Sequence, residues 1–305
     1  MIRAVVPRFR AALANAQRSA AFAAGRILSR LMPVAHAVRQ TRRDYQDHQQ
    51  RLLGERIPEA TSTEVADILS SLRRQGWHVV EGYWDRGTCQ RAVAEIDRIF
   101  RDYPQFIHPA PKSDTRVFGA DALSSLIGRF GQAPGLAEAA TLHNGIPTRL
   151  GMTLAARLVA SEGNLGSGEG WHRDQFFCAT KAMLYLTDVG PEQGPFQMLQ
   201  RSFECEDVCR DVRRASLRHM QYRIDDRQVA TLLDRDASRL KTFCAPAGTL
   251  IIFNASAIHR GKPISASVRY ALTNYYFTRY WSDDEIAKLF APVARPRDVL
   301  NVSAA

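Results

Sequence analysis

Residues 248–277 read GTLIIFNASAIHRGKPISASVRYALTNYYF. Two runs rich in β-branched and aromatic residues, at 247–254 and 267–279, flank a segment that contains glycine, proline and serine. Runs of this kind bounded by turn residues predict β-strands. His259 follows the first run, and Arg269 lies in the second. The stretch therefore predicts two neighbouring strands that bring a histidine and an arginine into the same region of the fold.

Shorter runs of the same kind precede this stretch, and turn residues separate them. They lie at 150–160, 173–178, 181–189 and 195–200. Many short strands at this spacing predict a β-sandwich or barrel. The earlier residues 61–143 show helical apolar periodicity instead, and a charged insertion at about 203–240 interrupts the strands. We therefore expect a mainly β domain with flanking α-helices, whose N-terminal helices cover one sheet.

Two capping-box patterns predict where helices begin. Thr61 is followed by Glu64 ahead of an apolar periodic run, and Ser282 is followed by Glu285. Gly76 should end the first of these helices, because glycine readily takes the left-handed conformation at a helix C-terminus.

Two histidines and one carboxylate give the strongest chemical signal. His172 and Asp174 are two positions apart, and side chains two apart on an extended strand point to the same side. His259 follows 85 residues after Asp174. Two imidazoles and one carboxylate are the ligand set that holds Fe(II) on one face and leaves three positions open. His172, Asp174 and His259 are therefore the candidate metal ligands and catalytic residues.

Two cationic residues are candidates for cosubstrate binding. Arg269 lies ten residues after His259, and its permanently charged guanidinium can bind the distal carboxylate of 2-oxoglutarate through two hydrogen bonds. Lys181 could contact 2-oxoglutarate or an acidic substrate from the metal-facing side of its strand, or else reach solvent. Arg116 could reach the mouth of the site. Trp171 could shield the metal or pack in the core.

The charge distribution argues against nucleic-acid binding by the folded body. The net charge is +10, but residues 1–43 hold nine arginines and no acidic residue, so the remaining chain is nearly neutral. A basic nucleic-acid groove is therefore not expected there. The five cysteines include no Cys-x-x-Cys pair and are expected to be reduced thiols of a cytosolic protein.

The N-terminal segment combines an apolar face with an arginine-rich one. Its apolar residues recur at helical spacing and are Phe9, Leu13, Ala16, Ala20, Ile27 and Leu31. Pro33 should end or kink this helix. A basic amphipathic helix can lie on an anionic membrane surface. It can also pack on its own protein or a partner, or target an organelle, and the sequence leaves these three alternatives open.

Three stretches resemble the phytanoyl-CoA dioxygenase family of Fe(II)/2-oxoglutarate oxygenases. They are GSGEGWHRDQFF (166–177), KAMLYLTDVGPEQGPFQML (181–199) and the strand pair at 248–277. The resemblance covers roughly residues 70–280. It implies a double-stranded β-helix, or jelly-roll, of the cupin-like kind, with flanking helices.

The resemblance also implies functions for individual residues. It implies iron ligation by His172, Asp174 and His259, and 2-oxoglutarate binding by Arg269. Because halogenating relatives lack the carboxylate, Asp174 favours hydroxylation. Where family members often carry Gly-Ser-His, this chain has Arg201-Ser202-Phe203. The insertion that follows is therefore expected to differ from the corresponding segment of other family members.

The implied function is hydroxylation of an unactivated carbon in a small-molecule, lipid or glycan substrate, with 2-oxoglutarate and O₂ as cosubstrates. One alternative is a non-catalytic membrane-associated adaptor that retains the fold. The other is a cupin-like metalloenzyme that does not use 2-oxoglutarate. We expect a cytoplasmic protein with peripheral contact to anionic membrane through residues 1–40.

The expected domain organisation follows from these patterns. Residues 1–43 form the basic amphipathic helix, and residues 44–60 form a linker. The oxygenase domain spans 61–290 and contains the insertion, and residues 291–305 form a C-terminal tail.

Overall fold

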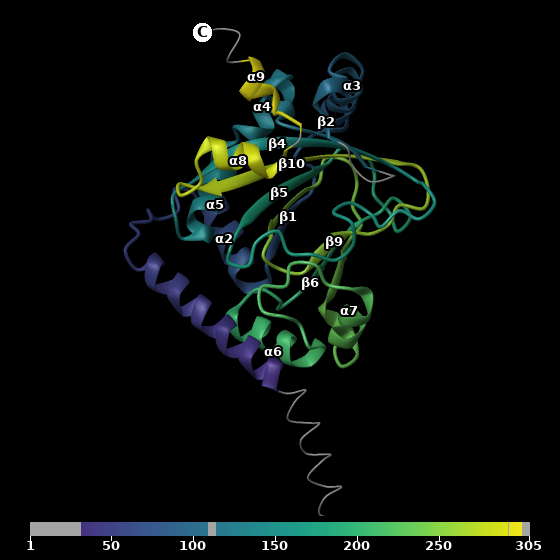
Figure 1. Cartoon of the computed structure of the whole chain (residues 1–305). Helices are drawn as coiled ribbons and strands as arrows, with labels where there is room; N and C mark the ends of the chain where they lie inside the picture. The colour runs from purple at the N-terminus through teal and green to yellow at the C-terminus, as the bar shows by residue number, and fades with distance from the viewer. Residues whose placement is uncertain (1–31, 109–113, 292, 301–305) are drawn as a thin grey trace, which may run out of the picture.

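Two antiparallel sheets form the centre of the molecule, which is seen here as a computed structural model that describes residues 32–108, 114–291 and 293–300 (Figure 1). The larger sheet has seven strands in the order β1-β8-β5-β10-β4-β3-β2, and the smaller has three in the order β7-β6-β9. Strand bounds are β1 Trp77–Val80, β2 Ile107–His108, β3 Asp114–Phe118, β4 Thr148–Val159, β5 Thr180–Tyr185, β6 Phe196–Leu199, β7 Leu240–Phe243, β8 Leu250–Asn254, β9 His259–Gly261 and β10 Val268–Thr278. Sequence neighbours are mostly not sheet neighbours, as in a jelly-roll, so the predicted fold class is confirmed.

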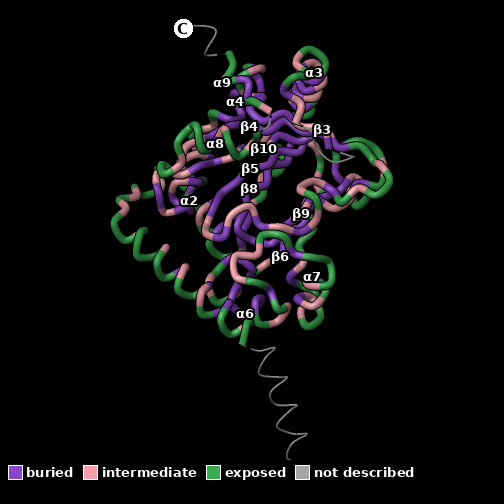
Figure 2. Tube along the Cα trace, in the orientation of Figure 1, coloured by how far each residue is buried: buried purple, intermediate pink, exposed green. Residues whose placement is uncertain are grey.

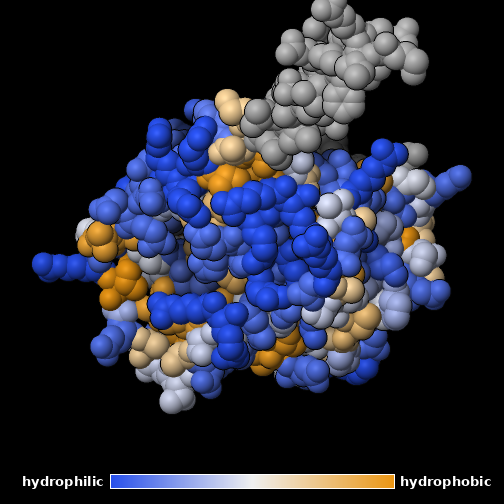
Figure 3. Space-filling model, turned by 90° about the horizontal axis from the view of Figure 1, so that it is seen from below, coloured by the Kyte–Doolittle hydropathy of each residue, from blue (hydrophilic) through white to orange (hydrophobic). Residues whose placement is uncertain are grey.

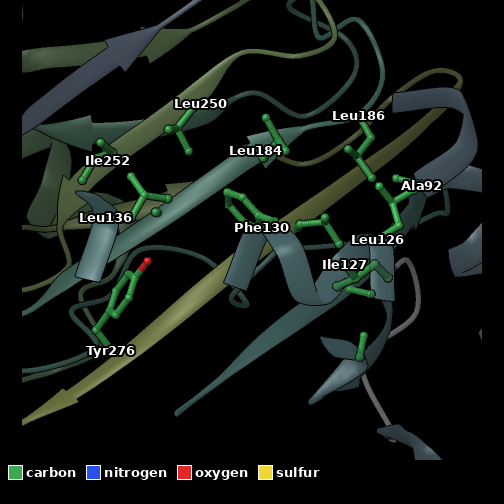
Figure 4. Packing of buried hydrophobic residues seen from close by; sticks show 14 of the residues in the cluster. Ala92, Leu126, Ile127, Phe130, Leu136, Leu184, Leu186, Leu250, Ile252 and Tyr276 are labelled. Atoms are coloured by element: carbon green, nitrogen blue, oxygen red, sulfur yellow. The ribbon is translucent and has the colours of Figure 1, made fainter. Parts of the chain in front are cut away.

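The first four helices of the body cover the outer face of the larger sheet. The helices are α2 Thr63–Gln75, α3 Arg86–Asp102, α4 Ser125–Gly131, α5 Pro134–Asn144, α6 Cys205–Ala215, α7 Asp226–Leu233, α8 Asp283–Leu289 and α9 Pro296–Leu300. Side chains of α2 to α5 pack with the sheet in one buried cluster. Figure 4 shows Phe130 and Leu136 from two of these helices among Leu184 and Ile252 from the sheet.

The central strands β5 and β8 are buried on both faces (Figure 2). Leu184 and Ile252 point to the helices, whereas Met183 and Ile251 point to the smaller sheet. This follows from the two-residue period of a strand. Each fully buried side chain of this size contributes about 1.5–3 kcal/mol to folding. The space between the two sheets is therefore the place where strand residues can form an enclosed site.

One of the two capping-box predictions is confirmed. Ser282 and Glu285 form a complete capping box at the start of α8. At α2, however, Ser62 is the N-cap and accepts from the backbone N–H of Val65. The prediction for Thr61 is wrong by one residue, because its hydroxyl and N–H bind the carboxylate of Glu138 on α5 instead.

A long helix over residues 32–52 runs along the outside of the body (Figures 1 and 2). It includes residues 44–52, which we expected to belong to a linker. Val38 and Tyr45 are buried in a cluster with side chains of α6. The Tyr45 hydroxyl lies within hydrogen-bonding distance of the carbonyl oxygens of Phe176 and Phe203, at 3.0 and 2.9 Å. This part of the segment therefore packs on its own protein. Residues 1–31, with most of the predicted amphipathic helix and the N-terminal side of Pro33, lie outside the described residues.

The insertion 203–240 is partly helical, as predicted, and contains α6 and α7. It packs against the helix 32–52 and against Trp171 and Phe176. All five cysteines are free thiols. Across the described ranges, we find no helix with the length and apolar character that crossing a membrane requires.

His143 at the end of α5 should make stability depend on pH. Its ring contacts the sulfur of Cys178 and the hydroxyl of Thr180, and burial lowers its pKa to about 3. Between pH 6.5 and about 3 the unfolded chain then binds a proton that the folded protein does not bind. Acidification in this window therefore lowers the free energy of unfolding, by at most about 1.4 kcal/mol per pH unit.

We expect the variant His143→Gln to lose this dependence. Between pH 7 and pH 5 the free energy of unfolding of the wild type should fall by about 1–2 kcal/mol more than that of the variant. Urea denaturation at both pH values measures the difference. Parallel losses in the two proteins would contradict a neutral buried imidazole.

Candidate active site

The three predicted metal ligands converge between the two sheets. One ligand atom from each of His172, Asp174 and His259 lies within 4.8 Å of the others. The Nε2 atom of His259 is 3.2 Å from Oδ2 of Asp174, and Nε2 of His172 is 3.7 Å from Oδ1. Two imidazoles and a carboxylate therefore face one point.

The backbone places the two histidines opposite each other. The N–H of each donates to the carbonyl of the other, both at 2.9 Å. The strand predicted at 173–178 is wrong, because His172 forms only isolated bridges, to His259 and to Arg223. Short pairing on both sides fixes this segment without a regular strand.

The alternation of side chains still holds locally, as predicted for His-x-Asp. Arg173 points away from His172 and Asp174, and its buried guanidinium donates to the carbonyls of Ser202 and Ser256. The backbone N–H of Asp174 donates to the carbonyl of Ala255. Both neighbours of Arg173 can therefore face the same point.

Backbone carbonyls orient both imidazoles. Nδ1 of His172 lies 2.8 Å from the carbonyl of Gly170, and Nδ1 of His259 lies 2.9 Å from that of Ala257. A carbonyl can only accept, so Nδ1 of each ring carries a proton, and Nε2 is the atom that can bind a metal when the ring is neutral. Burial, together with the His259 ring, lowers the pKa of His172 to about 3. The His172 ring is thus poised as a neutral ligand, and Nε2 of His259 faces the same point.

A lysine lies directly beside the carboxylate. The Nζ atom of Lys181 is 2.7 Å from Oδ2 of Asp174 and 3.7 Å from the centre of the Tyr275 ring. Burial opposes charge on the carboxyl, but Lys181 and His259 hold the pKa of Asp174 well below its usual value. Burial likewise opposes charge on the lysine, but Asp174 raises the pKa of Lys181. Asp174 is therefore an ionised candidate ligand.

A glycine-rich loop packs against the first ligand. Gly168 has a φ of +82°, and a Cβ added there would overlap Cε1 of His172. A Cβ at Gly166 would likewise overlap the carbonyl oxygen of Gly261. Only glycines allow the backbone to approach the ligand ring and β9 this closely.

We expect the variant Gly168→Ala to weaken Fe(II) binding by about 10- to 100-fold, as changes around metal ligands do, because the added methyl group displaces the His172 ring. Metal titration measures the effect. Gly82→Ala is the matched control: Gly82 also has a left-handed φ, of +65°, but nothing lies within 4 Å of an added Cβ, and Gly82 does not contact the metal ligands. Equal losses in both variants would mean that backbone strain, and not the ring contact, is responsible.

Arg269 lines the same cavity from β10. The cavity is about 190 Å³ in volume, and the triad, Lys181 and Arg116 also line it. Arg269 is buried and donates one hydrogen bond to the carbonyl of Gly194. Its Nε has no hydrogen-bond partner among the described residues. A buried guanidinium with an unused donor is suited to an anion that enters the cavity.

The cavity also contains residues that we did not predict. Tyr275 lies on the face of β10 that also carries Arg269, and the two-residue period could have identified it. Arg223 comes from the insertion and donates to the carbonyls of Gly168 and Glu169. No sequence pattern indicated Arg223, because its position depends on how the insertion folds back.

Two weaker predictions have clear outcomes. Arg116 does line the cavity, where it pairs with the buried carboxylate of Asp114. Trp171 packs in the core beside the insertion, and the Arg260 guanidinium lies 4.3 Å from its ring centre.

Comparisons with known proteins agree with this geometry. Residues 72–271 match the family model described as phytanoyl-CoA dioxygenase (PhyH). No curated protein sequence matches the chain.

Three solved structures illustrate the similarity of fold. The epimerase SnoN in complex with Fe3+, alpha ketoglutarate and nogalamycin RO is 20% identical, with a TM-score of 0.52, and the match covers 70% of this chain and 84% of that one. EctD from S. alaskensis in its apoform is 16% identical, with a TM-score of 0.53 and coverage of 73% and 80%. HygX from Streptomyces hygroscopicus with nickel, 2-oxoglutarate and hygromycin B bound is 16% identical, with a TM-score of 0.50 and coverage of 75% and 95%.

The family match spans about two thirds of the chain and includes the triad and Arg269. The jelly-roll sheets and the convergent His-Asp-His set are what such a protein requires. The chain therefore belongs to the phytanoyl-CoA dioxygenase (PhyH) family of Fe(II)- and 2-oxoglutarate-dependent oxygenases.

Proposed function

We propose that this oxygenase hydroxylates an unactivated carbon of a small-molecule, lipid or glycan substrate. His172, Asp174 and His259 would hold the iron, and Arg269 would bind 2-oxoglutarate. The observation that carries the proposal is the convergence on one point of two imidazole Nε2 atoms, whose Nδ1 atoms bond to backbone carbonyls, and the carboxylate of Asp174. This donor set suits Fe(II) and leaves open positions for cosubstrates.

Iron held by His172, Asp174 and His259, together with 2-oxoglutarate, would supply the oxidising power for inserting an oxygen atom from O₂ into a substrate C–H bond. The protein's own contribution is positioning and shielding. Arg269 orients the cosubstrate through its distal carboxylate. Leu154, Met183, Phe196 and Phe253 give the cavity an apolar wall that limits water. Asp174 fills the ligand position that a halogenase leaves open, which favours hydroxylation.

Uncoupled turnover tests the proposal. The purified protein should form succinate from 2-oxoglutarate in an Fe(II)-dependent reaction, and metabolite extracts that contain the substrate should stimulate it. The His172→Ala variant should abolish both the basal formation of succinate and its stimulation by extracts. A non-catalytic adaptor would form no succinate under any condition. A metalloenzyme of another kind would act without 2-oxoglutarate.

Lys181 is proposed as a second cationic contact for 2-oxoglutarate, next to its partner Asp174. We expect Lys181→Met to raise the KM for 2-oxoglutarate by about tenfold at saturating iron, which corresponds to one charge-assisted hydrogen bond. Steady-state kinetics and a separate iron titration measure the two affinities. If Lys181 only balances the charge of Asp174, iron affinity should rise and the KM should stay constant.

For its location, we propose a cytoplasmic protein with peripheral contact to anionic membrane through residues 1–40. The nine arginines and the absence of acidic residues in positions 1–43 support this proposal.

A further inference from the structure

Arginines gather on one face formed by the helix 32–52 together with α6 and α7. We call this the basic face, and its members are Arg39, Arg42, Arg43, Arg210, Arg213, Arg214 and Arg235. They line two hollows of about 440 and 610 Å³. Arg213 lines both hollows, so the two are neighbours. Figure 3 views the molecule from this end and shows strongly hydrophilic side chains running across it.

Most of this charge is not neutralised. Arg42 pairs with Glu206, and Arg210 pairs with Asp207. By contrast, four exposed arginines have no ion-pair partner within the described part of the chain, namely Arg39, Arg43, Arg213 and Arg235. Asp234 is the single acidic residue among the described residues that line the two hollows. The basic face therefore carries a clear excess of positive charge.

The chain that precedes this face favours a lipid surface over a nucleic acid. The described chain begins at Met32, close to the hollow that Ala35 and Val38 line. The 31 residues before it hold six arginines, no acidic residue and helically spaced apolar residues. An apolar stripe gains free energy by entering the headgroup region of a bilayer, whereas a nucleic acid offers it no such environment.

We propose that the basic face docks the protein on an anionic lipid bilayer, in continuity with the N-terminal segment. The segment between α6 and α7 carries Arg223, which lines the active-site cavity. Docking through these helices would place that side of the cavity near the headgroups. Given the proposed oxygenase function, the substrate is then a lipid or a lipid-linked molecule.

Vesicle binding by the full chain tests this proposal. The wild type should bind vesicles of phosphatidylcholine mixed with phosphatidylglycerol, should not bind phosphatidylcholine alone, and should be released by salt. Each arginine near such a surface strengthens binding about fivefold. The triple variant Arg39→Gln, Arg43→Gln, Arg213→Gln should therefore bind about 100-fold more weakly. These residues lie outside the active-site cavity.

A matched control uses three exposed arginines of α3 and α4, at the opposite end of the molecule (Figure 1). The variant Arg91→Gln, Arg101→Gln, Arg129→Gln has the same net charge as the first triple variant and should bind vesicles like the wild type. Equal weakening in both variants would mean that only net charge matters, and would overturn the proposal.

Two further outcomes would also overturn it. The first is wild-type vesicle binding by the basic-face variant. The second is tighter binding to a DNA duplex than to anionic vesicles, with the DNA binding lost in that variant. Succinate formation without vesicles should be unchanged in the basic-face variant. A failure of docking is therefore distinguishable from a failure of the proposed enzymatic function.

Discussion

Replacing Asp174 with alanine should abolish 2-oxoglutarate turnover, by at least about a thousandfold, which corresponds to about 4 kcal/mol. Two effects act together. The metal site loses its only anionic ligand, and the ammonium of Lys181, now 2.7 Å from the carboxylate, loses its partner. A buried unpaired cation next to two imidazoles repels a divalent ion. Succinate formation and a metal titration measure the two losses.

The double variant Asp174→Ala, Lys181→Met separates these effects. It removes the unpaired charge and still lacks the carboxylate, so it should not recover turnover. Asp188→Ala is the surface control, because that carboxylate is exposed and pairs with Arg86. Restored turnover in the double variant would show that charge repulsion, and not loss of a ligand, caused the defect.

The three residues of the triad could be predicted from the sequence because each is marked by a pattern within a short stretch of the chain. A His-x-Asp spacing needs only side-chain alternation, and His259 follows a strand that was evident from its composition. The side-chain direction was correct even though the predicted strand at 173–178 was not, since isolated bridges to His259 and Arg223 extend the backbone equally well.

Other features of the site depend on contacts that no local pattern encodes. The ion pair of Lys181 with Asp174 requires β5 to lie across the cavity from the segment after Trp171. The fit of Gly168 against His172 depends on the path of a whole loop. The N-cap of α2 shifted by one residue because Glu138 on another helix binds Thr61. In this last case a tertiary contact outweighed a local preference.

Arg269→Ala should raise the KM for 2-oxoglutarate by about 100-fold, or about 2.7 kcal/mol. The guanidinium is buried, holds the carbonyl of Gly194 and keeps Nε free of partners in the described structure. If Arg269 binds the cosubstrate as proposed, its removal leaves the distal carboxylate without a counter-charge in a confined site, and losses of this kind cost about 2–5 kcal/mol.

A comparison of two cosubstrates sharpens this test. A short 2-oxo acid that lacks the distal carboxylate gains nothing from Arg269, so the wild type should strongly prefer 2-oxoglutarate, and Arg269→Ala should lose that preference. Arg269→Lys should recover part of it, because lysine keeps the charge but not the two-donor geometry. Arg279→Ala controls for the loss of an arginine, since this side chain is exposed and lies outside the cavity. An unchanged preference in Arg269→Ala would mean that the cosubstrate binds elsewhere, and would favour a metalloenzyme that does not use 2-oxoglutarate.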